Sequence, residues 1–159
     1  MKRKKYYAAY GSNLNLKQMA RRCPDAKLVG TGYLKDYELL FKGSKSGSYL
    51  TVLPRVGSTV PVGIFMVSDQ DEKNLDVYEG YPRFYKKKSA DVAVVSADGK
   101  TTKHKRVFFY LMEKDRPFGL PSQAYLDTCL EGYRNCHLDP EFLETALYES
   151  KRRMNNEKD

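Results

Sequence analysis

Two stretches of the sequence carry residue types that could support acid–base chemistry. The first is the turn Gly11-Ser12-Asn13, which follows a short apolar and aromatic run and precedes a segment of helical periodicity. A strand that ends in such a turn and opens onto a helix leaves backbone N–H groups unpaired and pointing one way. Those groups could bind an anion or a developing oxyanion. A plain strand–turn–helix connection has the same pattern and is the alternative.

The second stretch contains Glu79, which lies near the C-terminal end of an expected helix. Because Glu79 follows Leu75 by four positions, a helix that packs through Leu75 turns Glu79 inward. Burial and the negative end of the helix dipole both raise the pKa of a carboxyl there, and a carboxyl that titrates near neutrality suits general acid–base catalysis. The alternative is a boundary glutamate that points to solvent or pairs with Arg83 or Lys86. The aromatic residues within 78–85 favour a partly dry pocket.

The surrounding patterns predict the elements that would position these groups. Strands are expected at about 6–10, 28–33, 37–41, 49–53, 60–67, 84–95 and 105–112, and helices are expected after the N-cap residues Asn15, Ser68, Ser122 and Asp139. The helix after Asn15 would bury the stripe Leu16, Met19, Ala20 and Cys23 and would end before Pro24. The helix after Ser68 would end at Gly80.

Short strands with frequent glycines indicate a strongly curved sheet or a small barrel. The whole chain is predicted to be one α+β domain, residues 1–159. Its core would span about residues 6–150, and a charged tail at 151–159 would fray.

Composition excludes several classes of protein. The longest apolar run, near residues 60–67, is too short to span a membrane. The basic N-terminus lacks the apolar region of a signal peptide, so a cytoplasmic protein is expected. The net charge is +8, but no helix-turn-helix, zinc-finger, KH or RRM signature accompanies it, so no specific nucleic-acid partner is predicted. Dispersed lysines also attract small anionic substrates.

The cysteines and histidines give little support to metal or thiol chemistry. Cys23, Cys129 and Cys136 are scattered, without a C-x-x-C pair, and the chain has only two histidines, His104 and His137. We therefore predict buried free thiols, no metal site and no cofactor.

Six motifs in order between about Tyr6 and Met112 resemble the γ-glutamylcyclotransferase-like family. They are Tyr10-Gly11-Ser12-Asn13-Leu14, Asn15-x-x-x-Met19, Arg22-Cys23-Pro24, the segment Gly32–Phe41, Val62-Gly63-x-Phe65, and Leu75-Asp76-x-Tyr78-Glu79-Gly80-x-Pro82-x-x-Tyr85. The resemblance implies a small mixed β-barrel flanked by helices. It also implies an enzyme that cyclises a γ-glutamyl amide to 5-oxoproline and releases an amine or amino acid.

The resemblance also implies which residues form the site. Glu79 would be the acid/base, and the substrate would be held by the loop Tyr10, Gly11, Ser12, Asn13 and Leu14 and by the pocket tyrosines Tyr85, Tyr110 and Tyr125. In this reaction the substrate's own α-amine attacks its γ-carbonyl, so no enzyme nucleophile is required. Ser12 as a covalent nucleophile is the weaker alternative, because no base is evident for it.

Other interpretations stay open at this point. A non-catalytic small-molecule or protein-binding module on the same fold is the main rival. Arg55 and Arg83 could bind a substrate carboxylate, although surface charge is the simpler explanation for each. The leaving group of the γ-glutamyl substrate and the oligomeric state, a homodimer included, are not determined. The sharpest expectation is spatial: the Glu79 carboxyl should face the Gly11–Asn13 turn across a pocket.

Overall fold

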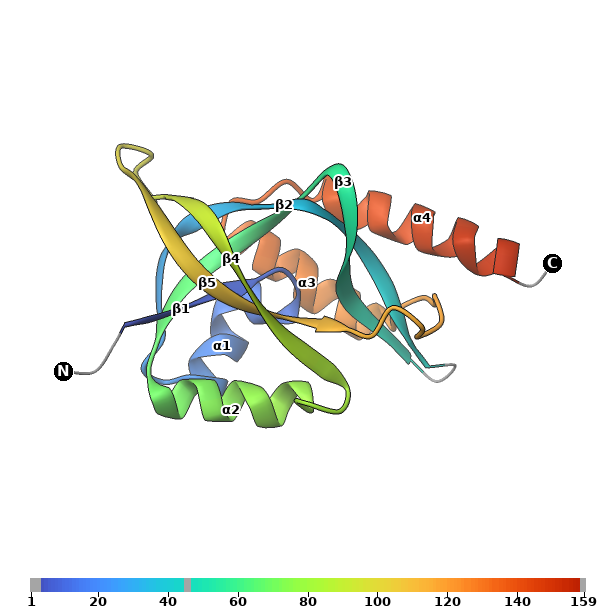
Figure 1. Ribbon diagram of the computed structural model, residues 1–159, viewed down its shortest axis with the longest axis horizontal. Coiled ribbons are helices and arrows are strands. Elements are labelled where there is room, and N and C mark those ends of the chain that lie inside the picture. The colour runs from blue at the N-terminus through green and yellow to red at the C-terminus, as the bar shows by residue number, and fades with distance from the viewer. Residues whose placement is uncertain (1–3, 45–46, 158–159) are drawn as a thin grey trace.

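The computed structural model describes residues 4–44 and 47–157. Five strands close into a barrel, and helices flank it (Figure 1). The strands are β1 (Lys5–Ala9), β2 (Lys27–Ser44), β3 (Gly47–Val67), β4 (Tyr85–Val95) and β5 (Thr102–Met112), and the helices are α1 (Leu16–Arg22), α2 (Asp69–Glu79), α3 (Gln123–Asn135) and α4 (Glu141–Glu157). The strand order is β1-β3-β2-β4-β5, with β1 and β5 parallel and the other pairs antiparallel. The predicted α+β fold, a small mixed barrel with flanking helices, is confirmed.

Two long strands, β2 and β3, replace the four short strands expected between residues 28 and 67. The expected gaps after residues 33 and 53 are local irregularities: the register shifts between Lys35 and Tyr37 on β2, opposite Thr59 and Pro54 on β3. The two strands pair again on both sides of this shift, so the expectation of four strands was wrong. Gly30 and Gly32 lie where β2 approaches β4: a Cβ atom on Gly32 would lie 2.7 Å from the Ala93 carbonyl oxygen, and Gly30 is crowded by Val95 in the same way.

The segment after β1 forms a single 3₁₀ turn (Ser12–Leu14) and then α1. The Asn15 side chain caps α1 by accepting a hydrogen bond from the Gln18 N–H at 3.2 Å, and α1 ends before Pro24 as expected. The expected apolar stripe is only half correct. Met19 and Cys23 are buried, but Leu16 and Ala20 are exposed because this two-turn helix lies at the surface.

Helix α2 begins and ends where the sequence indicates. Ser68 and Asp71 form a reciprocal capping box at its N-terminus, and Gly80 ends it in the left-handed conformation at φ 64°. Leu75 is fully buried and fixes the face of the helix that meets the protein interior. Glu79 is the last residue of α2, so its position follows from this packing and from the end of the helix at Gly80.

Helix α3 packs directly on the 3₁₀ turn. A Cβ atom on Gly132 would lie 2.6 Å from the Asn15 backbone nitrogen and 2.7 Å from the Leu14 carbonyl carbon. The Asn15 side chain also donates to the Thr128 carbonyl oxygen at 3.2 Å. The turn is therefore held against α3 by backbone contact as well as by a hydrogen bond.

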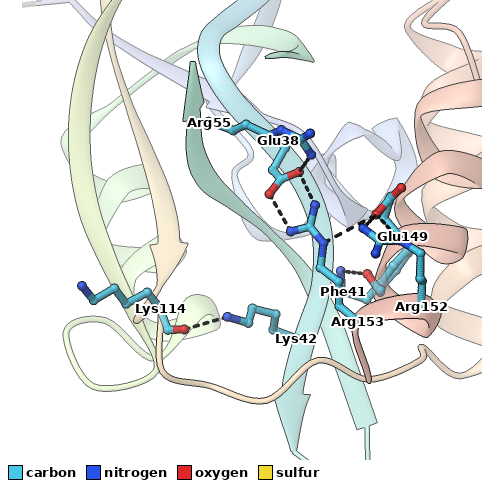
Figure 2. A network of polar contacts seen from close by, with 9 residues as sticks. Glu38, Phe41, Lys42, Arg55, Lys114, Glu149, Arg152 and Arg153 are labelled. Carbon is cyan, nitrogen blue, oxygen red and sulfur yellow. Dashed lines mark hydrogen bonds and ion pairs between the residues drawn. The ribbon is translucent and has the colours of Figure 1, made fainter. Parts of the chain in front are cut away.

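Helix α4 is anchored to β2 by the polar network in Figure 2. Arg153 donates two hydrogen bonds to the Glu38 carboxylate, at 2.7 Å and 2.8 Å, and Ser150 accepts one from the Phe41 N–H at 2.8 Å. Bidentate pairs of this kind are among the stronger charged contacts. The expectation that the chain frays from Lys151 was wrong for the described part of that segment, because α4 continues to Glu157. No helix among residues 4–44 and 47–157 is long and apolar enough to cross a membrane.

We predict that Gly132→Ala destabilises the protein by roughly 1–2 kcal/mol in urea unfolding. Alanine gains about 1 kcal/mol in helix propensity, but the new methyl group meets backbone atoms that cannot swing away, and overpacking of this kind outweighs the gain. Gly47→Ala is the matched control, because among the described residues a Cβ atom there meets nothing closer than the Tyr49 hydroxyl at 4.0 Å. Equal stability of Gly132→Ala and the wild type would show that α3 does not press on the turn.

Candidate active site

One pocket of about 300 Å³ lies between the turn after β1, the C-terminal end of α2, the start of β4 and helix α3. Its walls are formed mainly by aromatic side chains and the turn; the lining residues are Tyr7, Tyr10, Gly11, Ser12, Asn13, Tyr49, Leu50, Val77, Tyr78, Glu79, Gly80, Phe84, Tyr85, Tyr110 and Tyr125. Eight of the nine residues predicted from the sequence are in this set. Segments far apart in the chain therefore meet at one cavity.

Glu79 faces the turn across this pocket. The Asn13 side-chain NH₂ donates to Glu79 Oε1 at 3.3 Å, so the expected juxtaposition is confirmed. Burial raises the pKa of the Glu79 carboxyl to about 7, and the positive charge of Arg22 acts in the opposite direction. Glu79 forms no ion pair with Arg83 or any other described residue, and Lys86 pairs with Glu113 instead.

The backbone of the turn supplies fewer donors than expected. The Leu14 N–H donates to the Gly11 carbonyl oxygen at 3.0 Å and is therefore occupied. The N–H groups of Gly11, Ser12 and Asn13 have no acceptor among residues 4–44 and 47–157. Three backbone donors at the pocket wall thus remain available.

Leu14 does not line the pocket, which corrects its assignment as a substrate-binding residue. Its side chain is fully buried on the opposite side of the turn, where a Cβ atom on Gly63 or on Gly132 would contact it. An apolar residue is required there because the turn packs on α3. Leu14 supports the turn and does not touch the cavity.

Two pocket tyrosines are fixed by the backbone of one residue of β3, Leu50. Tyr85 donates its hydroxyl hydrogen to the Leu50 carbonyl oxygen at 2.8 Å, and the Tyr125 hydroxyl accepts from the Leu50 N–H at 3.1 Å. Burial raises the pKa of both tyrosines well above its usual value, so both are neutral at pH 7. The Tyr125 hydroxyl also bonds to the Cys129 thiol and lowers its pKa against the effect of burial.

A second chain of bonds fixes the other two tyrosines. Tyr10 donates to the Tyr110 carbonyl oxygen at 2.6 Å, and the Tyr110 hydroxyl donates to Asp76 Oδ1 at 2.6 Å. Asp76 is on α2, three residues before Glu79, and Lys87 of β4 pairs with it at 2.8 Å. The bonds tie the helix that carries Glu79 to the barrel.

Several residues of the pocket and its border were not selected from the sequence. Tyr7 accepts from the Asn13 NH₂ at 3.0 Å, and Tyr78 lies 3.2 Å from Ser12 between hydroxyl oxygens. Tyr78 precedes Glu79 in its motif, which is a usable signal, whereas nothing distinguishes Tyr7 from its neighbour Tyr6. Tyr49 and Phe84 also line the pocket, and Arg22 lies behind its wall, where it contacts Asn13 and Tyr78.

Other candidate groups lie outside the pocket. Arg55 pairs with Glu38 at 2.9 Å, and Arg83 does not line the cavity. Cys23, Cys129 and Cys136 are free and buried, as predicted. Among the described residues, no group of three or more His, Cys, Asp or Glu side chains is placed to hold a metal ion.

Comparison with known proteins relates this geometry to a family. The family model described as gamma-glutamyl cyclotransferase, AIG2-like, matches residues 7–127. A search of curated proteins finds no match.

Solved structures share the fold. A human protein described as uncharacterized is 24% identical, with a TM-score of 0.77 over 91% of this chain and 87% of its own. A structure described as gamma-glutamyl cyclotransferase is 24% identical, with a TM-score of 0.74 over 91% and 86%. YkqA from Bacillus subtilis is 25% identical, with a TM-score of 0.69 over 97% of this chain and 55% of its own. The family match and the shared barrel show that the chain belongs to the gamma-glutamyl cyclotransferase, AIG2-like family.

Proposed function

We propose that the protein is a γ-glutamyl cyclotransferase that converts a γ-glutamyl amide to 5-oxoproline and releases an amine or amino acid. The observation that carries the proposal is the half-buried Glu79 carboxyl, which accepts from the Asn13 amide in a pocket that the turn Gly11–Asn13 also lines. Membership of the family supports the same reaction. A non-catalytic binding module would have no need for a carboxyl whose burial raises its pKa toward neutrality.

Glu79 is the proton carrier in this proposal. It takes a proton from the substrate α-ammonium, whose reference pKa is about 7.7–8.0. Because the pKa of Glu79 is about 7, this transfer is close to balanced in free energy. The freed amine attacks the γ-carbonyl carbon and forms the ring C–N bond. Glu79 then returns a proton to the leaving nitrogen as the original amide C–N bond breaks, and the ring nitrogen passes its second proton to the released amine, which leaves as an ammonium.

The turn stabilises the charge that develops on the carbonyl oxygen. The tetrahedral intermediate carries an oxyanion, and backbone N–H groups fixed in advance are effective partners for it. The N–H groups of Gly11, Ser12 and Asn13 are the donors available at the pocket wall. Their positions are set by the contact between the turn and α3.

The aromatic walls confine the substrate. Hydrogen bonds hold four tyrosine rings in the pocket wall, those of Tyr10, Tyr85, Tyr110 and Tyr125. A rigid, partly dry cavity favours a folded glutamyl chain with the amine near its own carbonyl. It also limits access of water, which would hydrolyse the amide to glutamate.

We predict that Glu79→Gln lowers 5-oxoproline release by about 10²–10⁴-fold, because the amide keeps the shape but carries no proton. The measurement is 5-oxoproline formed from a panel of γ-glutamyl amino acids, γ-glutamyl amines and glutathione. Glu144→Gln removes an exposed carboxyl on α4 outside the pocket and is the control that should retain activity. Activity of Glu79→Gln near the wild-type level would exclude the mechanism, and no release from any substrate by the wild type would favour the binding module.

The pH dependence of the reaction should follow the ionisation of Glu79. Because the base form is required, we expect kcat/KM to fall about tenfold per pH unit below the Glu79 pKa of about 7. A rate profile measured from pH 5 to 8 checks this. A profile without an acid limb above pH 5 would contradict the assignment of Glu79 as the base.

Glu79 should also lower the stability of the folded protein at high pH. The folded pKa of about 7 lies above the ordinary value of 4.5, so the folded state binds the proton more tightly. Stability from this group is therefore fully present below about pH 4.5 and is lost as the pH rises through 7. We predict that Glu79→Gln is more stable than the wild type at pH 8, by roughly 1–3 kcal/mol in urea unfolding, and that the difference disappears near pH 4.5.

Glu38→Gln is the control of opposite sign for this stability measurement. Burial alone would raise the pKa of Glu38, but hydrogen bonds from Arg153 and Arg55 lower it below its usual value. Removal of the Glu38 charge should therefore destabilise the protein at pH 8. A Glu79→Gln variant that is no more stable than the wild type at pH 8 would show that the Glu79 carboxylate is well solvated.

A further inference from the structure

Arg22 is the cationic side chain bound to the turn, and it comes from the last residue of α1. Its guanidinium donates to Asn13 Oδ1 and to Gln18 Oε1, each at 2.5 Å. The same group lies over the ring of Tyr78, with Cζ 3.6 Å from the ring centroid. The Asn74 side chain donates to the Arg22 carbonyl oxygen at 2.9 Å, so α2 contacts both ends of this residue.

These contacts decide which end of the Asn13 amide faces the pocket. A guanidinium is only a donor, so it must meet the amide oxygen. The NH₂ group of Asn13 is therefore turned to the other side, where it donates to Glu79 at 3.3 Å and to Tyr7 at 3.0 Å. If the amide were reversed, its oxygen would face the carboxylate, and that contact would favour only the protonated acid.

We propose that Arg22 is a positioning residue of this site: it fixes the Asn13 amide so that its NH₂ group donates to the Glu79 carboxylate, and its charge favours the ionised form of that carboxylate. Arg22 does not line the cavity, so it acts through Asn13 and through its electric field. A single side chain, that of Asn13, therefore connects Arg22 to Glu79. The catalytic part of the proposal rests on the proposed function, but the effect on Glu79 does not.

The other ionisable side chains around Glu79 carry no positive charge that could favour its carboxylate form. The side chains that face it from β1, the turn, β4, β5, α3 and α2 are Tyr7, Tyr10, Tyr85, Tyr110, Tyr125 and Tyr78. Burial raises the pKa of the first five, so they are neutral when Glu79 titrates. Among the described residues, Arg22 is the charged group that acts on the Glu79 carboxyl, and it lowers the pKa against the effect of burial.

The test is a direct titration of Glu79 in the full chain, without substrate. Glutamate side chains are labelled with ¹³C, and the Glu79 signal is identified by its loss in Glu79→Gln. We expect Arg22→Met to raise the Glu79 midpoint by about 1 pH unit, because a nearby positive charge shifts a carboxyl by about that amount or more. Arg22→Lys keeps a charged donor and should leave the midpoint close to that of the wild type.

Arg21→Met is the matched control. Arg21 is on the same helix and carries the same charge, but it is exposed and forms no ion pair with any described residue. Its removal should not move the midpoint. An unchanged midpoint in Arg22→Met, or an equal shift in Arg21→Met, would overturn the proposal. Arg22→Gln replaces Arg22→Met if the methionine variant does not fold, with the same expected rise and the same overturning result.

Kinetics provide a second readout. On a substrate that the wild type converts, Arg22→Met should lower kcat by about 10-fold to 100-fold with little change in KM, because the base is misplaced while the pocket is intact. The acid limb should move to higher pH together with the titration midpoint. Arg22→Lys should recover most of kcat. Equal kcat losses in the lysine and methionine variants would overturn the proposal. If the wild type released no 5-oxoproline, the proposed function would be excluded, and the titration would decide the role of Arg22.

Discussion

The hydrogen bond between the Asn13 amide and the Glu79 carboxyl joins two points that are 66 residues apart in the chain. A carboxyl at the end of a helix is stable as an anion when water surrounds it, and here the fold removes much of that water. The barrel must therefore hold α2 close to the turn after β1. Leu75 buries one face of α2, and Asp76 is tied to Tyr110 of β5 and to Lys87 of β4. These contacts keep Glu79 in the wall of the cavity.

Two tyrosines, Tyr85 and Tyr125, both stabilise the fold and form the pocket wall. Tyr85 and Tyr125 bind the backbone C=O and N–H groups of Leu50, which would otherwise be unpaired at the cavity. Their rings then form the wall. Because each hydroxyl has a fixed partner, the rings cannot turn into the space that a substrate would fill. The N–H groups of the turn and the Glu79 carboxyl are the polar groups left to meet a ligand, and the proposed cyclisation would use both.

Much of this arrangement can be predicted from the sequence, because it depends on local rules. The caps at Asn15, Ser68 and Gly80 follow from side-chain chemistry close in sequence. The length of β2 and β3 could not be predicted this way. Asp36 and Gly57 lie where the sequence places gaps between strands, and only the pairing of β2 with β3 on both sides of them shows that the strands continue.

Long-range contacts explain the remaining errors. Leu14 is adjacent to pocket residues in sequence, but α3 draws its side chain to the far side of the turn. Arg153 looks like part of a solvated charged tail until Glu38 of β2 is placed beside it (Figure 2). Arg22 is similar: nothing in its spacing to Glu79 indicates that Asn13 links them. Sequence patterns locate the turn and the carboxyl, whereas the bonds between them depend on tertiary structure.

One group, Glu79, is proposed both to titrate near neutrality and to carry the proton in the reaction. The most direct test measures two midpoints in the same preparation: the ¹³C titration of Glu79 in the substrate-free protein and the acid limb of kcat/KM for 5-oxoproline formation. We predict that both lie near the Glu79 pKa of about 7 and coincide. A Glu79 midpoint near the ordinary value of 4.5, with an acid limb elsewhere, would contradict it.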